Sequence, residues 1–382
     1  MPGMQTGPRQ AAGLLPRGLT QVARRRLQPE TFGLPVEQIR RGFFTDVYFN
    51  RTRSVLEQNG LHPRVLMQVF QKKDAWLGGM DEAIACLKLA SGSEDGQGKW
   101  ISGWHQLEVR ALFDGDRISP YETVMTIEGD YTLFAHLETV YLGSLARGTL
   151  VTNNVRAALD AARGKPVLMF GARHDHYSVQ PLDGLAAHVA GIDQVSTDAQ
   201  ACFWQGKGIG TIPHSLIASY GGDTVAATRA FADIYYPEVN IVSLVDFDND
   251  CVTTSLAVAR DLGERLWGVR LDNSETLVDR SLWDDMGYFK PTGVQPELAF
   301  RVREALDAEG FQQVRIVVSA GFDAGRIDHF EAAGAPVDAY GVGSSLIRGE
   351  NDYTADVVRL DGRLCAKVGR RYRPNDRLEP VE

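Results

Sequence analysis

The chain has 382 residues, a formal net charge of -9, 44% hydrophobic residues and 23% charged residues. This is the balance of an ordinary globular protein that is long enough for two packed cores, and its acidity argues against a general nucleic-acid binder while leaving room for local basic pockets for anionic metabolites. No apolar run reaches transmembrane length, and the four cysteines are scattered, so we expect a cytoplasmic protein with reduced thiols and no membrane partner.

The beginning of the chain differs in composition from the rest. The first 29 residues contain five arginines and no acidic residue. They lack the apolar segment of a secretory signal. We interpret residues 1–30 as a flexible arm and expect the fold to begin near Thr31.

The next segment, residues 31–134, predicts an α+β domain. Helical patterns occur at 53–60 and 80–91. Residues 106–132 show short alternating runs broken by Asp-Gly, Ser-Pro and Glu-Gly turns, which is typical of antiparallel strands. The tail, 351–382, reads as a hairpin, and we expect it to return to this domain.

From about residue 135 the pattern becomes an alternation of helices and strands. Helices are predicted at 134–145, 155–162, 223–235 and 295–308. The alternation predicts a parallel sheet covered on both faces, and we expect an irregular or incomplete β/α barrel over residues 135–350. Its expected strands are 166–170, 194–197, 240–246, 266–271, 314–319 and 337–340, with Thr211-Ile212 as a weak seventh.

Two glycine-bearing stretches follow successive predicted strands, one helix apart. They are Ser319-Ala320-Gly321 and Gly341-Val342-Gly343-Ser344. Glycine lets backbone N–H groups approach an anion closely, and the last two strand ends of a β/α barrel commonly form a phosphate site. Ordinary glycine turns would explain either stretch alone. Together, the two stretches leave phosphate binding and ordinary turns equally open.

Polar side chains mark the other predicted strand ends, which converge on one face of such a barrel. Arginines, aspartates and a glycine cradle together suit a polyanionic, hydroxyl-rich substrate with a divalent metal. Each residue also has an ordinary explanation, because aspartates after strands often cap helices and the two histidines of His174-x-His176 lack a third metal ligand. The residues are Arg173, His174, His176, Asp198, His214, Asp246, Asp248, Arg270 and Asp272.

Several motifs occur in an order that resembles the nicotinate phosphoribosyltransferase family of type II phosphoribosyltransferases, and in particular its short archaeal-type members. Any one of these motifs is weak, whereas the ordered set between residues 43 and 348 is specific. The matching segments are Thr45-Asp46-Val47-Tyr48-Phe49, Ile127-Glu128-Gly129, Leu137-Glu138-Thr139-Val140, Phe170-Gly171-Ala172-Arg173, Gly210-Thr211-Ile212-Pro213-His214-Ser215, Val269-Arg270-Leu271-Asp272, Ser319-Ala320-Gly321 and Tyr340-Gly341-Val342-Gly343.

This resemblance implies an enzyme of NAD salvage that converts nicotinate and phosphoribosyl pyrophosphate into nicotinate mononucleotide and pyrophosphate, with ATP as a co-substrate. It also implies a homodimer with shared active sites. The acidic net charge leads us to expect no nucleic-acid partner. The pyridine ring would lie between Phe170 and the partner's Tyr48. Arg173 and Arg270 would hold carboxylate or phosphate groups.

The resemblance assigns the remaining roles as well. Asp272 would contact the ribose hydroxyls or a Mg²⁺ ion, and Asp246 would assist it. His214 matches the histidine that family members phosphorylate when ATP drives the reaction. The 5′-phosphate would rest on Ser319, Ala320, Gly321, Gly341, Gly343 and Ser344.

The sequence also departs from the family pattern. Asp198 stands where nicotinamide-using relatives carry an aspartate, and a carboxylate there would repel nicotinate unless an arginine lay close. Asn273 follows Asp272 where serine is common, residues 247–250 read FDND, and Ala320 replaces a glycine and narrows the room for a phosphate. Nicotinamide or quinolinate phosphoribosyltransferase, or a non-catalytic sensor of phosphoribosyl pyrophosphate or pyridine nucleotides, therefore stay open as alternatives.

Overall fold

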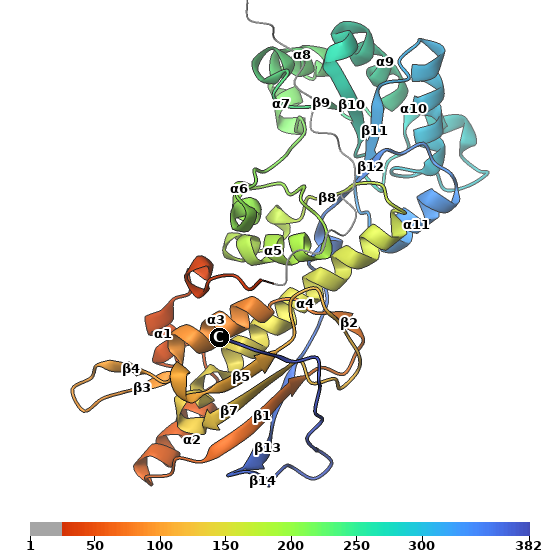
Figure 1. The fold of residues 1–382 in the computed structure, drawn as a ribbon. Coiled ribbons are helices and arrows are strands. Elements are labelled where there is room, and N and C mark those ends of the chain that lie inside the picture. Colours follow the sequence, from red (N-terminus) through yellow and green to blue (C-terminus); the bar gives the residue numbers. More distant parts are fainter. Residues whose placement is uncertain (1–24) are drawn as a thin grey trace, which may run out of the picture.

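The longest helix, α4 (Glu138–Ala161), runs between two separate sheets in the computed structural model, which describes residues 25–382 (Figure 1). The sequence pattern predicts two helices here, 134–145 and 155–162, because glycine, threonine and asparagine lie between them. That prediction is wrong, since the helix is continuous. Gly148 lies so close to Gly79 that a Cβ at position 148 would be 2.5 Å from the Gly79 nitrogen. Tertiary packing therefore stabilises the helix where its local propensity is weak.

A six-stranded antiparallel sheet lies at the N-terminal end of α4, with the strand order β14-β13-β1-β7-β5-β15. The chain's tail supplies three of these strands, so the tail returns to the N-terminal part of the chain. We call this part the N-terminal lobe. Its strands are β1 (Arg64–Phe70), β5 (Glu108–Ala111), β7 (Met125–Asp130), β13 (Thr354–Leu360), β14 (Arg363–Leu364) and β15 (Glu379–Pro380).

Short helices and two small two-stranded sheets complete the N-terminal lobe. Alternate residues of β1 point to opposite faces, and Val65, Met67 and Val69 pack into the core with residues of α3 and α4. The helices are α1 (Val36–Arg40), α2 (Val47–Gln58) and α3 (Met80–Ala90), and the paired short strands are β2 (Ala75–Trp76) with β6 (Arg117–Ile118) and β3 (Gly92–Glu94) with β4 (Trp100–Ser102).

A five-stranded parallel sheet forms the second part, with the order β8-β12-β11-β10-β9, and we call this part the barrel lobe. Its strands are β8 (Val167–Met169), β9 (Ile241–Leu244), β10 (Leu266–Leu271), β11 (Arg315–Val318) and β12 (Ala339–Val342). Its helices are α5 (Gln180–Ala190), α6 (Asp198–Ala201), α7 (His214–Ser219), α8 (Thr224–Tyr235), α9 (Cys251–Leu262), α10 (Pro296–Ala308) and α11 (Ala324–Ala332).

The parallel sheet does not close regularly between its edge strands β8 and β9. Two of the predicted strands, 194–197 and Thr211-Ile212, are not strands in the structure. Single contacts span the gap instead, because Val195 bridges Met169 and the Ile212 nitrogen donates to the Val242 carbonyl at 3.4 Å. The segment between them carries glycine at every second position from 206 to 210, so few side chains are available to support a ladder. The prediction of an irregular or incomplete barrel is thereby confirmed.

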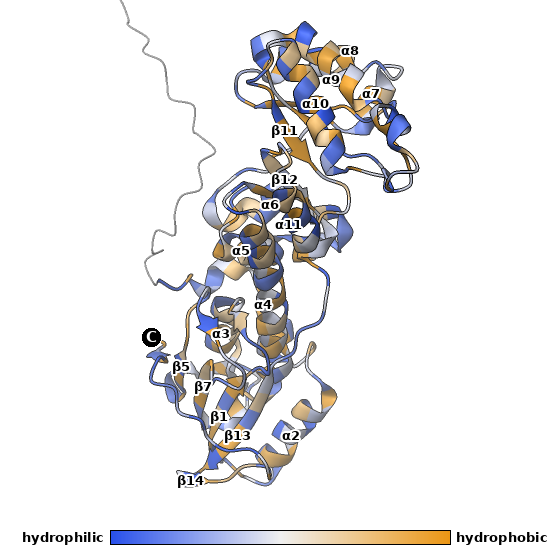
Figure 2. Cartoon of the chain, turned by 90° about the vertical axis from the view of Figure 1, so that its right-hand side faces the viewer, coloured by the Kyte–Doolittle hydropathy of each residue, from blue (hydrophilic) through white to orange (hydrophobic). Residues whose placement is uncertain are grey.

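The barrel lobe is built around buried β-branched strands. In β11 the residues Ile316, Val317 and Val318 are all at most 1% exposed, as expected of a strand covered on both faces, and Figure 2 shows this strand in the apolar colour. Among residues 25–382, no helix combines the length and apolar character needed to cross a membrane.

The predicted flexible arm lies for the most part outside the described residues, which begin at residue 25. Its described end contacts the N-terminal lobe. Arg26 donates to the Asp81 carboxylate at 3.1 Å, and the Leu27 nitrogen donates to the same carboxylate at 2.9 Å.

Candidate active site

A cleft of about 680 Å³ opens at the carboxyl ends of the parallel strands. This is the face on which the sequence predicts the polar strand ends, and most of the predicted site residues line it. Because these residues come from segments far apart in the chain, only the parallel topology brings them together. The predicted residues in the lining are Phe170, Arg173, His174, His214, Arg270, Asp272, Ser319, Ala320, Gly321, Gly341, Gly343 and Ser344.

Arg270, at the end of β10, is a cation held by several partners in the cleft. Its Nε donates to the Ser319 hydroxyl at 2.8 Å, its Nη1 donates to the Thr211 hydroxyl at 2.9 Å, and its Nη2 lies 3.1 Å from the Asp272 carboxylate. The guanidinium also lies over the Phe170 ring, 5.0 Å from its centroid. Ser319 donates to Asp272 at 2.5 Å. These contacts pre-orient one guanidinium and one carboxylate beside an aromatic ring.

His214, which lines the cleft, forms a second polar pair with Asp246, which is not part of the lining. The His214 Nε2 and the Asp246 Oδ2 are 3.0 Å apart, and the histidine is half-exposed while the aspartate side chain is buried. Burial raises the pKa of Asp246, and the nearby His214 opposes that shift. The other carboxylate oxygen of Asp246 is buried without a hydrogen-bond partner among the described residues. Asp246 therefore holds the imidazole through one oxygen, while its second oxygen makes no hydrogen bond within the described part of the chain.

The two glycine-bearing stretches have different local geometries. Ala320 and Gly321 both adopt left-handed backbone conformations, with φ of 71° and 70°, which is unusual for alanine. Gly341 is required by packing, because a Cβ there would lie 2.7 Å from the Phe170 ring. Gly343 is similar, since its Cβ would lie 2.9 Å from the His174 ring. The glycines of the second stretch thus let cleft side chains lie directly on the backbone.

Two predicted substrate-binding residues, Tyr48 and Asp198, do not line this cleft. Asp198 begins α6, and its carboxylate accepts a hydrogen bond from the Gly208 nitrogen at 2.8 Å, which closes the intervening loop. Its neighbour Thr197 does line the cleft. No sequence signal singled out Thr197 or the hydroxyl of Thr211 that binds Arg270, although Thr211 lies within one of the matching motifs.

Tyr48 lies in the N-terminal lobe with a second set of motif residues. It is 59% exposed on α2. Close by, the Thr139 hydroxyl donates to the Asp46 carboxylate at 2.9 Å and accepts from the Asp46 nitrogen at 3.0 Å. Burial raises the pKa of Glu138 to about 7. The structure therefore joins two motifs whose contacting residues are 93 positions apart in the sequence, on the lobe that does not contain the cleft.

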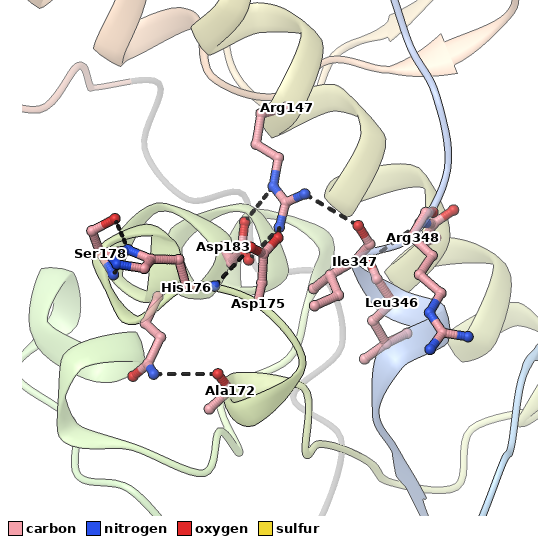
Figure 3. A network of polar contacts seen from close by, with 11 residues as sticks. Arg147, Ala172, Asp175, His176, Ser178, Asp183, Leu346, Ile347 and Arg348 are labelled. Carbon is pink, nitrogen blue, oxygen red and sulfur yellow. Dashed lines mark hydrogen bonds and ion pairs between the residues drawn. The ribbon is translucent and has the colours of Figure 1, made fainter.

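A partly buried ion-pair network ties α4 to two loops of the cleft (Figure 3). Arg147 donates to both oxygens of Asp183 at 2.8 and 2.7 Å, to Asp175 at 3.1 Å and to the Ile347 carbonyl at 3.2 Å. The loop around Asp175 carries Arg173, and the loop before Ile347 carries two of the predicted phosphate-binding residues. The arginine therefore fixes both loops to one helix, and no sequence motif signalled this role.

The departures from the family pattern after β9 and β10 contact one another. Asn273 donates to the Asn249 side chain at 2.9 Å and to the Asp279 carboxylate at 3.2 Å. The Cys251 nitrogen also donates to that carboxylate at 2.9 Å. Asn273 and Asp279 are at most 1% exposed. These unusual residues form one polar network that links the loops after the two strands.

Comparisons with known proteins identify relatives of this sequence and this fold. Residues 46–148 match the family model for the quinolinate phosphoribosyl transferase N-terminal domain. The crystal structure of nicotinate-nucleotide pyrophosphorylase from Pyrococcus furiosus is 31% identical, with a TM-score of 0.74 over 88% of this chain and 80% of that one. Human nicotinic acid phosphoribosyltransferase is 16% identical with a TM-score of 0.60, over 84% of this chain and 75% of that one, which shows a shared fold.

A curated relative shares the sequence over a more limited length. Nicotinate phosphoribosyltransferase pncB1 of Mycobacterium tuberculosis is 30% identical over 258 residues, which are 66% of this chain and 52% of that protein. The chain thus spans about half the length of the curated relatives that it matches.

Proposed function

The chain belongs to the type II phosphoribosyltransferase family, and from this premise we propose that it transfers the phosphoribosyl group of phosphoribosyl pyrophosphate to nicotinate in NAD biosynthesis. The products would be nicotinate mononucleotide and pyrophosphate. The observation that carries the proposal is the set formed by Arg270, Asp272, Ser319 and Phe170 at the strand ends, which offers a cation, a carboxylate and an aromatic surface in fixed positions.

In this proposal the pyridine ring stacks on Phe170 and its carboxylate pairs with an arginine, for which Arg270 and Arg173 are available. The ring nitrogen already carries a lone pair, so it attacks the anomeric carbon without a general base. The carbon–nitrogen bond forms as the carbon–oxygen bond to pyrophosphate breaks. Catalysis then consists of positioning and of stabilising the departing pyrophosphate.

The residues present fit a Mg²⁺ ion of the kind that binds together with a substrate. Mg²⁺ commonly takes one or two carboxylates and completes its shell with phosphate oxygens and water. Asp246 has a buried oxygen without a partner, and the charge of nearby Asp272 adds to the increase in its pKa. These two carboxylates would hold the ion, and the ion would neutralise charge on the pyrophosphate. No cluster of three or more acidic, histidine or cysteine ligands occurs among the described residues, so substrate oxygens would complete the shell.

His214 is the proposed site of ATP-dependent phosphorylation. Because one imidazole nitrogen is held by Asp246, the opposite nitrogen is available for phosphoryl transfer, and the half-exposed ring leaves access to it. The partner's Tyr48 would cover the second face of the pyridine ring in a homodimer. The exposure of Tyr48 supports this arrangement, as does that of Phe43 and Val47, which are 72% and 58% exposed on the same lobe.

Quinolinate is the second candidate substrate. The match of residues 46–148 to the quinolinate phosphoribosyl transferase N-terminal domain favours it, and two arginines in the cleft could pair with two carboxylates. Nicotinamide receives less support, because the residue that suggested it, Asp198, bonds to the Gly208 nitrogen and does not line the cleft.

Pyrophosphate release from phosphoribosyl pyrophosphate and Mg²⁺ tests these alternatives, with nicotinate, nicotinamide and quinolinate assayed in parallel, each with and without ATP. We expect turnover with nicotinate that is stimulated by ATP in the wild type and not in His214→Ala. Carbon dioxide release with quinolinate would transfer the assignment to that substrate. Binding of phosphoribosyl pyrophosphate without release from any acceptor would overturn the enzyme proposal and favour a sensor.

A further inference from the structure

A second cleft, of about 540 Å³, lies on the N-terminal lobe where the tail crosses the six-stranded sheet. It shares no residue with the active-site cleft. We call it the arginine cleft, because three arginines of the tail line it. Its lining consists of Gln68 and Phe70 from β1, Tyr121 from a loop, and Gly369, Arg370, Arg371 and Arg373 from the tail.

The alternation of side chains along β1 explains how the sheet contributes to this cleft. Val65, Met67 and Val69 pack into the core of the N-terminal lobe. Gln68 and Phe70 alternate with these core residues and therefore face the other side of the sheet, where the tail runs. The arginine cleft thus lies on the face of the sheet that is turned away from that core.

One segment of the tail is basic, although the whole tail, residues 351–382, is nearly balanced, with seven basic and six acidic residues. Residues 359–377 contain seven basic and two acidic residues, whereas the chain carries a net charge of -9. Arg370 pairs with Asp356 at 3.0 Å. Within the described part of the chain, no ion pair involves Arg371 or Arg373. The arginine cleft therefore holds two guanidinium groups whose charge no described carboxylate balances at close range.

The backbone that carries these arginines is fixed by a buried side chain. Gln68 is 2% exposed, and its amide nitrogen donates to the Arg371 carbonyl at 2.9 Å while its amide oxygen accepts from the Arg373 nitrogen at 3.0 Å. The Thr123 hydroxyl donates to the Arg373 carbonyl at 2.6 Å. The arginines thus extend from a segment whose backbone is bound to the sheet.

Aromatic rings orient two of the guanidinium groups. Arg370 lies over Phe70, 5.4 Å from the ring centroid, and Arg373 lies over Tyr121 at 5.1 Å. A guanidinium that rests on an aromatic ring keeps its N–H edge available for an oxyanion, with little rotamer freedom left to lose. Tyr121 has a φ of 63°, a conformation that is rare for a bulky residue and that clusters at functional sites.

We propose that the arginine cleft binds a polyphosphate group, such as that of a nucleoside triphosphate, at a site separate from the active-site cleft. Arginine pairs with phosphate oxygens through two parallel hydrogen bonds, and several oriented guanidinium groups match a chain of phosphates better than a single carboxylate. This proposal does not depend on the proposed enzymatic function.

Isothermal titration of the full chain with inorganic tripolyphosphate, ATP and adenosine tests the proposal. The test variant is Arg371→Gln with Arg373→Gln. Its matched control is Arg363→Gln with Lys367→Gln, which removes the same charge from the same tail outside the arginine cleft. The test variant and the control are each also combined with Arg270→Gln, which weakens anion binding in the active-site cleft and so separates the two clefts.

We expect tripolyphosphate affinity to fall at least about tenfold in the test variant and to change less than about twofold in the control, because charge-assisted arginine–phosphate pairs are lost only in the former. Tighter binding of ATP than of tripolyphosphate would support a nucleotide as the ligand, and equal binding would support the phosphate chain alone. Equal loss of tripolyphosphate affinity in the test variant and in the control would show an effect of overall charge alone and would overturn the proposal. The proposal would also be overturned if Arg270→Gln abolished tripolyphosphate binding and the test variant left it unchanged.

Discussion

Substituting Arg147 by methionine should destabilise the protein strongly, because it leaves the Asp183 carboxylate buried and unpaired. The Asp183 side chain is 4% exposed and accepts two short hydrogen bonds from this arginine. Removing one partner of a buried pair costs about 3–5 kcal/mol. Because the Arg147 side chain is 31% exposed, water can partly replace it, and we expect the lower end, about 3 kcal/mol.

Urea unfolding followed by tryptophan fluorescence measures this effect. With a denaturant slope of about 3 kcal/mol per molar, the midpoint should fall by about 1 M. The control is Arg147→Met combined with Asp183→Leu, which removes both charges and should recover most of the loss. A midpoint shift below about 0.3 M in the single variant, or simple additivity in the double variant, would refute the reasoning.

Three further predictions concern the active-site cleft and a buried carboxylate. Arg270→Lys keeps the charge and loses the fork geometry, so kcat/KM should fall about 100-fold with little change in Tm, and equal activity would contradict the assigned role. Gly341→Ala should lower the free energy of unfolding by about 1–3 kcal/mol, because the added Cβ would collide with the Phe170 ring. The control is Gly325→Ala, whose Cβ would make only an ordinary contact at 3.5 Å, and thermal unfolding should show it to be neutral or slightly stabilising. Burial raises the pKa of Glu82 to about 7, so the folded state binds the proton of this carboxyl group more tightly than the unfolded state does. The protonated carboxyl group therefore adds to the free energy of unfolding below about pH 4.5, and this contribution is lost as the pH rises through about 7. Glu82→Gln should therefore stabilise the protein by about 1–3 kcal/mol at pH 8 and by much less at about pH 4.5, and urea midpoints that differ equally at both pH values would contradict this.

Much of the fold could be predicted because its signals are local. The buried strand at 315–318 is rich in β-branched residues, and α8 and α10 lie within one residue of their predicted bounds. The errors occurred where local preference and packing disagree. The middle of α4 has weak helical propensity, and it is helical because Gly148 fits against Gly79.

The candidate site was also partly readable from the sequence. Residues at the ends of parallel strands must share one edge of the sheet, so Arg270, Asp272 and Ser319 could be grouped from the strand pattern alone. The same reasoning could not place Asp198, because its carboxylate bonds to a backbone nitrogen ten residues away. Nor could it find Arg147, which is one helical arginine among many until its partners on other elements are seen.

The sequence by itself determined the alternation of strands and helices, the order of the motifs and the chemical character of the strand ends, because periodicity and residue type act locally. Only the tertiary structure decided which groups meet. It placed Tyr48 in the lobe without the active-site cleft, left the barrel irregularly closed, and joined Arg371 and Arg373 to Gln68, which lies 303 and 305 positions away from them. Such contacts depend on how the chain returns on itself, and no local pattern records that path.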